Sequence, residues 1–387
     1  MLPHLKTYLA ALPGAPDFPY ALFSPGRINI IGEHTDYTGG LVMPAAIDKG
    51  IEFRARKIDG GVMRLHAIDL GETHELALPA GPEKSGKLWA DYLAGIIFEF
   101  QLLGHAVPAL EIAFGGNVPR GSGMSSSAAL EGGMAFLLNE VTGAGISRAQ
   151  LAVLCRRSSN NYIGVPTGIM DQFASLNGSA EGPIKLNCDT LEYTPVIADT
   201  PGYSWLLVNS MVTHELGSSE YPVRVRECAE ALSAIRSAYP EVPCLSLADR
   251  AQLEAIKGKL SDTVYRRADY VISENARVHA MEAALSRGDV AGAGELLNAT
   301  HAGLRDDFAV SCAEVDFLQA EATTNFPGSV MGARIMGGGF GGCTINLVKT
   351  ADIPTVKDHL LAAYAEAYGK APEFYAVNIG AGTRLIN

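Results

Sequence analysis

The chain has 387 residues, of which 48% are hydrophobic and 19% charged, and its formal net charge is -12. This length exceeds one ordinary hydrophobic core and predicts two domains, with enough apolar residues to fill both. The acidic balance argues against nucleic acid or an anionic membrane as a partner, although a small phosphorylated ligand can still bind where local dipoles or a metal ion dominate. No run approaches the roughly 18 apolar residues of a membrane span, so we expect a globular protein.

The six cysteines lie far apart in the sequence and form no Cys-x-x-Cys pair. This spacing predicts reduced thiols in a cytoplasmic protein, without a structural zinc site. The N-terminus carries one lysine before a short apolar stretch, which does not fit a secretory signal.

The segment from Ser24 to Asp48 places a short apolar strand, residues 28–31, before a polar loop. Two carboxylates, an imidazole and hydroxyls within four residues offer the acceptors and donors that the hydroxyls of a polyol need. The alternative is an Asx or Ser/Thr turn whose other side chains lie in solvent. A metal site would need a second cluster at ligand spacing. The loop residues are Glu33, His34, Thr35 and Asp36.

Residues 51–78 alternate apolar and polar side chains, which predicts antiparallel strands. Residues 89–103 predict a helix that Gly104 ends. Trp89 and Tyr92 lie three positions apart on one face of this helix. The pattern alone favours a place in the core over a place beside an adenine ring.

A glycine- and serine-rich stretch follows a strand expected over residues 109–114. Pro119 and two glycines forbid regular structure up to Met124, and the Ala-Ala-Leu after Ser127 begins a helix that Gly143 ends. Unpaired N–H groups at the helix N-terminus, the helix dipole and the serine hydroxyls together attract a phosphate group. The alternative is an ordinary turn with a serine N-cap. The candidate residues are Gly121, Ser122, Gly123, Met124, Ser125, Ser126 and Ser127.

Two other nucleotide motifs are excluded. A P-loop needs a lysine after its second glycine, and no lysine occurs between Lys87 and Lys185. Gly337, Gly339 and Gly342 match Gly-x-Gly-x-x-Gly, but a strand-like run follows where a Rossmann site requires a helix.

Two further features follow the serine-rich stretch. Gly132 and Gly133 each cost its helix about 1 kcal/mol relative to alanine, which predicts close packing against another element. After a second helix over residues 148–162, a Gly/Pro loop ends in Asp171. On its own, this aspartate is typical of an N-cap or a first-turn charge.

The periodicity fades between residues 187 and 200, and we place the boundary between two domains, 1–195 and 196–387, at that point. A strand is expected at 205–209, amphipathic helices over 220–324, and strands again within 332–348 and 373–379. Strands and helices that mix without strict alternation predict an α+β fold in both domains.

Three segments resemble the signature motifs of the GHMP small-molecule kinases, and the first resembles that of galactokinases in particular. They are residues 24–37, 119–130 and 337–343. Further matches in the family's order are Trp-Ala-Asp-Tyr at 89–92, Gly-Ile-Met-Asp-Gln at 168–172, Ser-Ser-Glu-Tyr-Pro-Val-Arg at 218–224, Ser-Glu-Asn-Ala-Arg-Val at 273–278 and Leu-Arg-Asp-Asp-Phe-Ala-Val-Ser-Cys at 304–312. The resemblance covers the chain from about residue 20 onward, and it implies a two-domain GHMP kinase fold with the active site in the cleft between the domains.

The resemblance implies an enzyme that uses ATP and Mg²⁺ to phosphorylate the anomeric (C1) hydroxyl of galactose, giving galactose 1-phosphate and ADP. Asp171 would be the catalytic acidic residue facing that hydroxyl, and Arg27 would stabilise the transition state. We expect a monomer whose partners are a small sugar and ATP, with no nucleic acid and no membrane. The implied sugar-binding residues are Glu33, His34, Thr35, Asp36, Gly168 and Tyr221. The implied nucleotide-binding residues are Trp89 and Tyr92 near adenine and Gly121 to Ser127 around the phosphates, with Ser127 also a magnesium ligand.

One position departs from the family. Galactokinases usually carry a glutamate that helps to hold magnesium 12 residues before the catalytic aspartate, and here (171 − 159 = 12) that position is Ser159. Serine is a neutral, weak ligand and leaves the ion to waters, phosphates and Ser127. Glu131 lies one helical turn after Ser127 on the same face, so we hypothesise that it substitutes through a water.

The departure leaves two other functions open. One is a sugar- and ATP-binding sensor with little turnover, against which stand the intact Ser-Ser-Ser-Ala-Ala, Arg27 and Asp171. The other is a kinase for a related sugar such as N-acetylgalactosamine or L-arabinose, because one or two pocket residues and the available volume decide between such sugars.

Overall fold

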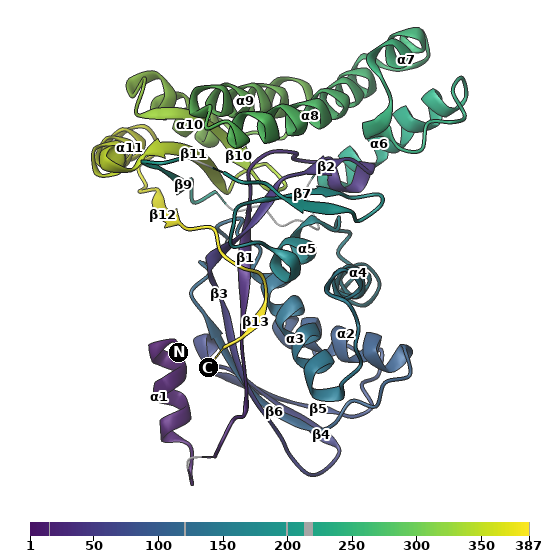
Figure 1. Cartoon of the computed structure of the whole chain (residues 1–387), viewed down its shortest axis with the longest axis vertical. Coiled ribbons are helices and arrows are strands. Elements are labelled where there is room, and N and C mark those ends of the chain that lie inside the picture. The colour runs from purple at the N-terminus through teal and green to yellow at the C-terminus, as the bar shows by residue number, and fades with distance from the viewer. Residues whose placement is uncertain (15, 120, 199, 213–219, 387) are drawn as a thin grey trace.

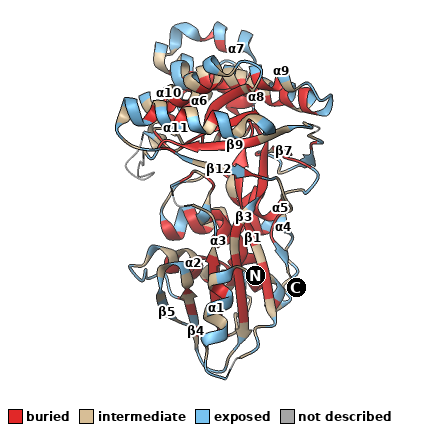
Figure 2. Ribbon diagram, turned by 90° about the vertical axis from the view of Figure 1, so that its left-hand side faces the viewer, coloured by how far each residue is buried: buried red, intermediate tan, exposed pale blue. Residues whose placement is uncertain are grey.

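The computed structural model describes residues 1–14, 16–119, 121–198, 200–212 and 220–386. Of the motif residues quoted above, Arg120, Ser218 and Ser219 lie outside these ranges. Figure 1 shows two parts: a lower one built from strands and helices of the first half of the chain, and an upper, mainly helical one built from the second half. Figure 2 shows that the central strands of both parts are buried while the outer faces of the helices are exposed.

A six-stranded sheet organises the lower part, in the order β13-β1-β3-β6-β4-β5. Its pairs are antiparallel except β4 with β6, which run parallel. The antiparallel strands expected over residues 51–78 are therefore confirmed for β4 and β5, but β6 separates β4 from β3. The strands are β1 (Tyr20–Asn29), β3 (Pro44–Lys57), β4 (Val62–Ala67), β5 (Glu72–Ala77), β6 (Leu110–Gly116) and β13 (Arg384–Leu385).

Strand β1 is longer than the short strand expected at residues 28–31. It starts at Tyr20 and continues through Pro25, where the register with β3 shifts between Pro25 and Arg27. A bulge of this kind accommodates a proline inside a strand, and the proline concealed the earlier half of β1 in the sequence.

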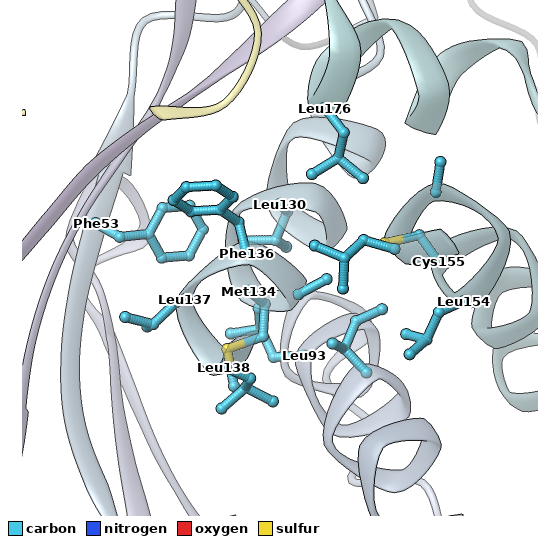
Figure 3. Close-up of a cluster of buried hydrophobic side chains, with 14 of the residues drawn as sticks. Phe53, Leu93, Leu130, Met134, Phe136, Leu137, Leu138, Leu154, Cys155 and Leu176 are labelled. Carbon is cyan, nitrogen blue, oxygen red and sulfur yellow. The ribbon is translucent and has the colours of Figure 1, made fainter. Parts of the chain in front are cut away.

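Four helices cover one face of this sheet, and α1 (Pro3–Ala11) lies on the other side (Figure 1). Figure 3 shows the apolar cluster between these four helices and the sheet. Phe53 of β3 points toward α3, which contributes Leu137 and Met134, and Leu93 and Leu154 come from neighbouring helices. The helices are α2 (Leu88–Leu102), α3 (Ser126–Thr142), α4 (Arg148–Arg157), which continues as a π-helix over Ser158–Ile163, and α5 (Met170–Asn177).

The two glycines inside α3 lie where the helix packs against other elements. A Cβ on Gly133 would lie 2.2 Å from Cε2 of Phe53, and a Cβ on Gly132 would lie 3.3 Å from Oγ of Ser175. Gly133 therefore has no room for a side chain unless Phe53 moves, so the expected close packing is confirmed. The approach of α3 to β3 offsets the low helix propensity of glycine.

The upper part is built on a four-stranded antiparallel sheet in the order β10-β11-β9-β12. The strand expected at 205–209, the run of helices after it and the return to strands beyond the helices are confirmed, as is the α+β class. The strands are β9 (Tyr203–Asn209), β10 (Val330–Met336), β11 (Cys343–Lys349) and β12 (Glu373–Val377). The helices are α6 (Tyr221–Arg236), α7 (Arg250–Ala255), α8 (Asp262–Ser286), α9 (Val290–Ala302), α10 (Ala313–Asn325) and α11 (Ile353–Tyr368).

A small sheet and the C-terminal segment connect the two parts. The small sheet has the order β2 (Leu41–Val42), β7 (Ile184–Asn187) and β8 (Tyr193–Pro195). The C-terminal segment runs back along the lower part, where Thr383 N–H donates to Ser175 O at 2.8 Å and β13 pairs with β1. The boundary after residue 195 stays a prediction, and the last strand of the chain belongs to the sheet of the first half.

None of the helices in the described ranges has the length and apolar character needed to cross a lipid bilayer.

Candidate active site

A cavity of about 330 Å³ lies where loops from both parts of the molecule meet. Three of its walls are loops that we name by composition: the acidic loop (residues 33–36), the serine loop (residues 121–127) and the glycine loop (residues 337–342). A fourth is the segment of residues 165–172. Of the residues expected in the site, those on its lining are Arg27, Glu33, His34, Asp36, Tyr92, Gly121, Ser122, Gly123, Met124, Ser125, Ser126, Ser127, Gly168, Asp171 and Tyr221.

Arg27 and Asp171 form a two-pronged ion pair in this cavity. Arg27 Nε donates to Asp171 Oδ1 at 2.7 Å, and Nη2 donates to Oδ2 at 2.6 Å. The third nitrogen, Nη1, donates to Gly123 O of the serine loop. The arginine side chain is 6% exposed and the aspartate side chain 29%, so the carboxylate remains open to the cavity while the guanidinium fixes its plane.

Ser125, within the serine loop, directly precedes α3 but does not cap this helix with its side chain. Ser125 has φ 55°, in the left-handed region, and α3 begins at Ser126. The hydroxyl of Ser125 donates instead to Asp171 Oδ2 at 2.7 Å. The first N–H groups of α3 have no intrahelical acceptor, and Ser126 and Ser127 line the cavity. Such a helix start attracts an anion through its N–H groups and its dipole.

His34 is held in an uncommon conformation at the opposite wall. Its φ is 63°, its Nδ1 lies 2.9 Å from the Tyr37 hydroxyl, and its ring packs 4.8 Å from the ring of Phe308. Burial, aided by the charge of Arg224, lowers its pKa to about 3, so the imidazole is neutral. Nε2 is buried, and no group in the described ranges hydrogen-bonds it in good geometry, although the backbone of Gly338 lies near the ring. A ligand hydroxyl can supply that partner.

Asp36 sits directly against Gly168. A Cβ on Gly168 would lie 1.6 Å from Asp36 Oδ2, so any side chain there would displace the carboxyl group. Removal from water, together with the nearby carboxylates of Asp171 and Glu33, raises the pKa of Asp36 to about 7. At neutral pH this group can therefore both donate and accept a hydrogen bond.

Glu33 is tied to the upper part of the molecule by Arg334 of β10. Arg334 is fully buried, and its Nη1 donates to Glu33 Oε2 at 2.6 Å. Asn29 Nδ2 donates to the same oxygen at 3.0 Å, and Gly337 N–H donates to Oε1 at 3.1 Å. The acidic loop and the glycine loop are thus joined through one carboxylate. From the sequence, the glycine loop was a motif without a role in the site. Arg334 was not expected in the site, and its only sequence signal is its position near that loop.

Two of the expected residues do not line the cavity. Thr35 is buried, and its hydroxyl is directed to the carbonyls of Gly32 at 2.8 Å and Leu41 at 2.7 Å. The indole of Trp89 donates to Glu72 at 3.0 Å and packs 5.7 Å from the ring of Phe114. Their expected contacts with the sugar and with adenine stay predictions. Tyr92 does lie on the lining, where it hydrogen-bonds Ser127.

Oxygen atoms beside Ser127 form the part of the cavity that can hold a divalent cation. Ser159 Oγ donates to Glu131 Oε1 at 2.6 Å, and Gln172 Nε2 lies 3.4 Å from Glu131 Oε2. Ser127, Ser159 and Gln172 line the cavity, whereas Glu131 lies behind them. Gln172 Oε1 is buried without a hydrogen-bond partner among the described residues. Sequence reasoning missed Gln172, although it directly follows Asp171 in a motif.

These groups suit magnesium held jointly with a ligand, not a complete protein cage. No cluster of three His, Cys, Asp or Glu side chains that could hold a metal occurs in the described part of the chain. Magnesium prefers oxygen ligands and is commonly held by one or two protein oxygens, waters and substrate phosphates. The neutral oxygens around Ser127 fit that pattern.

Comparisons with known proteins agree with one another. The family model "Galactokinase galactose-binding signature" matches residues 11–57, and "GHMP kinases N terminal domain" matches residues 91–179. A galactokinase of Roseiflexus sp. (strain RS-1) is 35% identical over 359 residues, covering 93% of this chain and 91% of the relative. A galactokinase of Clostridium beijerinckii is 36% identical over 376 residues, covering 96% of each.

Solved structures give the same result. The structure of Lactococcus lactis galactokinase complexed with galactose matches with a TM-score of 0.90 and 34% identity over 95% of both chains. The Methanococcus jannaschii mevalonate kinase, at a TM-score of 0.66 and 15% identity over 96% of this chain and all of that one, shares the fold.

The pKa of Glu131 generates a stability prediction. Burial raises this pKa from 4.5 to about 8, so the folded chain keeps a proton that the unfolded chain releases, and stability falls as the pH rises through this window. Glu131→Gln cannot ionise and avoids the loss. Its free energy of unfolding, relative to that of the unchanged protein, should rise from pH 5 to pH 8 by up to about 1.4 kcal/mol per pH unit.

Urea unfolding of both proteins at pH 5, 6, 7 and 8 measures this difference. Glu366→Gln, on the exposed part of α11, is the matched control for loss of a carboxyl group. If the difference between Glu131→Gln and the unchanged protein is the same at every pH, Glu131 does not titrate within this window.

Proposed function

The chain belongs to the galactokinase family of GHMP kinases, and from this premise we propose that its cavity transfers the γ-phosphoryl group of ATP to the anomeric hydroxyl of galactose. The products are galactose 1-phosphate and ADP. One observation carries the proposal: the carboxylate of Asp171 is held by Arg27 and by Ser125, and Ser125 directly precedes the N-terminus of α3. The hydroxyl acceptor and the phosphate donor therefore meet at one carboxylate.

The sugar is assigned to the wall formed by the acidic loop and its neighbours. His34 Nε2 needs a hydrogen-bond partner, and the raised pKa of Asp36 allows it to donate as well as accept. A sugar with several hydroxyls supplies both kinds of partner. Gly168 preserves the position of Asp36, and Tyr221 packs 5.5 Å from the ring of His34. These contacts would orient the anomeric hydroxyl toward Asp171.

The nucleotide is assigned to the serine loop. Phosphoryl transfer is largely dissociative in most analyses, so the protein mainly aligns the attacking oxygen with the γ-phosphate and compensates charge on its equatorial oxygens. The N–H groups and dipole of α3 supply fixed partial positive charge for this purpose. Arg27, which is almost fully buried, supplies a full positive charge between the serine loop and Asp171.

Asp171 would act on the sugar hydroxyl. Its oxygens already accept three hydrogen bonds, from Arg27 and Ser125, which fix the direction in which the open side of the carboxylate points. From there it can orient the hydroxyl and accept its proton late in the reaction, when the oxygen has become acidic through bonding to phosphorus. Positioning matters more than basicity in such a step.

Magnesium, when bound with ATP, would neutralise charge on the phosphates. We propose that Ser127 and the oxygens of Ser159 and Gln172 face the hydrated ion, and that Glu131 acts through them from behind the wall. The hydrogen bond from Ser159 to Glu131 leaves the serine lone pairs free for the cavity side. The cytoplasmic location and the monomeric state expected from the sequence stay predictions.

Two alternatives differ in measurable ways. A kinase for N-acetylgalactosamine or L-arabinose would use the same phosphate machinery with a different sugar. A sensor would bind sugar and ATP without turnover, and the paired Arg27 and Asp171 argue against it.

A sugar panel tests the function. We expect the protein with ATP and magnesium to release ADP in the presence of galactose, and much less with N-acetylgalactosamine, L-arabinose or no sugar, measured by a coupled ADP assay. Activity confined to another sugar would support the related kinase. Galactose binding by calorimetry without ADP release would support the sensor.

Replacement of the acidic residue tests the mechanism. Asp171→Asn keeps the size of the side chain but removes the negative charge, and we expect kcat with galactose to fall at least about 100-fold. Asp59→Asn, at an exposed turn outside the cavity, is the control and should keep its activity. Near-normal turnover in a correctly folded Asp171→Asn variant would remove Asp171 from the catalytic role.

The magnesium proposal has a separate test. Groups that orient a metal site from behind typically change metal affinity about 10- to 100-fold when replaced. We therefore expect Glu131→Gln to raise the magnesium concentration for half-maximal activity about 10-fold at saturating galactose and ATP, in an assay above pH 8, where Glu131 with its pKa of about 8 carries its charge. An unchanged magnesium dependence would show that Glu131 does not assist the ion.

A further inference from the structure

The segment Phe308–Val310 lies behind the cavity wall and carries a motif to which the proposed function gives no role. It belongs to the Leu-Arg-Asp-Asp-Phe-Ala-Val-Ser-Cys stretch at 304–312. None of its three residues lines the cavity. Ala309, in its middle, has φ 52°, in the left-handed region that a residue with a Cβ rarely occupies. A backbone in this conformation persists only where its surroundings hold it.

Two buried arginines hold the backbone carbonyls of this stretch. Arg224 of α6 donates from Nε to Phe308 O at 2.8 Å and from Nη2 to Ala309 O at 2.8 Å. Arg267 of α8 donates from Nη1 to Asp307 O. Each arginine is 5% exposed. Three successive carbonyls are therefore fixed by two side chains from different helices.

Glu227 joins the two arginines. Its Oε2 lies 3.3 Å from Arg224 Nη1 and 3.0 Å from Arg267 Nε. A buried guanidinium is stable only when it is paired and its N–H groups are satisfied. The carbonyls and Glu227 together meet that requirement, and the planar fork of arginine suits two carbonyls in a way that lysine cannot match. We call Arg224, Glu227 and Arg267 the carbonyl clamp.

The clamped segment contacts two walls of the cavity. Phe308 packs 4.8 Å from the ring of His34, in the acidic loop. Val310 O accepts a hydrogen bond of 2.6 Å from Phe340 N–H, in the glycine loop. A Cβ on Gly339 would lie 2.4 Å from Val310 O, so the two backbones touch. A shift of Phe308–Val310 would therefore move His34 and the glycine loop together.

We propose that Arg224, acting within the carbonyl clamp, is a positioning residue for the sugar side of the active site. The proposal rests on the proposed function, because it assigns the wall of His34 to galactose. Arg224 touches no reacting atom. It fixes the Phe308 ring behind His34, and His34 is already strained at φ 63° and depends on that packing for its direction.

The test is the KM of galactose in Arg224→Met, which keeps a long apolar stem and loses the fork. We expect the KM for galactose to rise about 10- to 100-fold, as a small displacement of a binding group can cause, while the KM for ATP changes less than about threefold. Arg224→Lys keeps the charge but satisfies fewer carbonyls, and its KM should lie between those of Arg224→Met and the unchanged protein. Arg226→Met, an exposed position on the same helix, is the control.

A merely structural role predicts a different result. It would lower Tm and the fraction of active protein, and so kcat, without changing the KM for galactose in the molecules that fold. An unchanged KM for galactose in Arg224→Met would overturn the proposal. If Arg224→Met fails to fold, Phe308→Leu keeps the clamp and removes the ring behind His34. A KM for galactose that is raised in Phe308→Leu supports the proposal, and one that is unchanged overturns it.

Failure of the proposed function is recognised separately. Absence of ADP release by the unchanged protein with galactose would reject the kinase but leave the clamp testable by the galactose-induced rise in Tm, which needs no turnover. A smaller rise in Arg224→Met than in the unchanged protein supports the positioning role, and an equal rise overturns it.

Discussion

The buried ion pair of Arg334 and Glu33 is the interaction on which the site depends, because it joins the two parts of the molecule at the cavity wall. Arg334 comes from β10, in the sheet of the second half, and Glu33 from the loop after β1. Both are withdrawn from water, so removal of either partner would leave a buried charge unpaired, which typically costs about 3–5 kcal/mol. Through Gly337 N–H the same carboxylate fixes the start of the glycine loop. Through these contacts Glu33 helps to fix the shape of the cavity wall.

In the proposed function, the site places carboxylates close to an anionic nucleotide, and its electrostatics reflect that conflict. Burial, followed in size by the charges of Asp171 and Glu33, raises the pKa of Asp36 to about 7. This group can therefore carry a proton instead of a third negative charge. Arg27 compensates Asp171 and Arg334 compensates Glu33. Because a protein with a net charge of -12 gives an anion no general attraction, the local field of Arg27 and the start of α3 has to provide it.

The sequence predicted the parts of this site better than their connections. The acidic, serine and glycine loops were recognised from their Gly, Ser, Asp and His residues, because those residue types are needed at a helix start or a polar wall. Helix α3, with Gly143 as its C-cap, and the strand after the glycine loop followed from local patterns. Arg334, Arg224 and Gln172 were not found in this way. A buried arginine has no local signature in the sequence, and its partners lie far along the chain, up to 305 residues away for Arg334. The early half of β1 was missed because Pro25 resembles a strand end in sequence and is a bulge in the fold.

Ser125 joins the proposed phosphate site to the Asp171 carboxylate with very few bonds. As the residue before α3, it would ordinarily cap the helix with its hydroxyl. Its left-handed backbone directs the hydroxyl to Asp171 instead, and the N–H groups of the next residues remain available for a phosphate. Because reaction rate in phosphoryl transfer depends on alignment more than on strong bases, a path of one residue and one hydrogen bond between the proposed anion site and the Asp171 carboxylate is an advantage. The carbonyl clamp would give His34 the same kind of support from behind, so that in the proposed function each substrate meets a wall whose shape is fixed by buried charges.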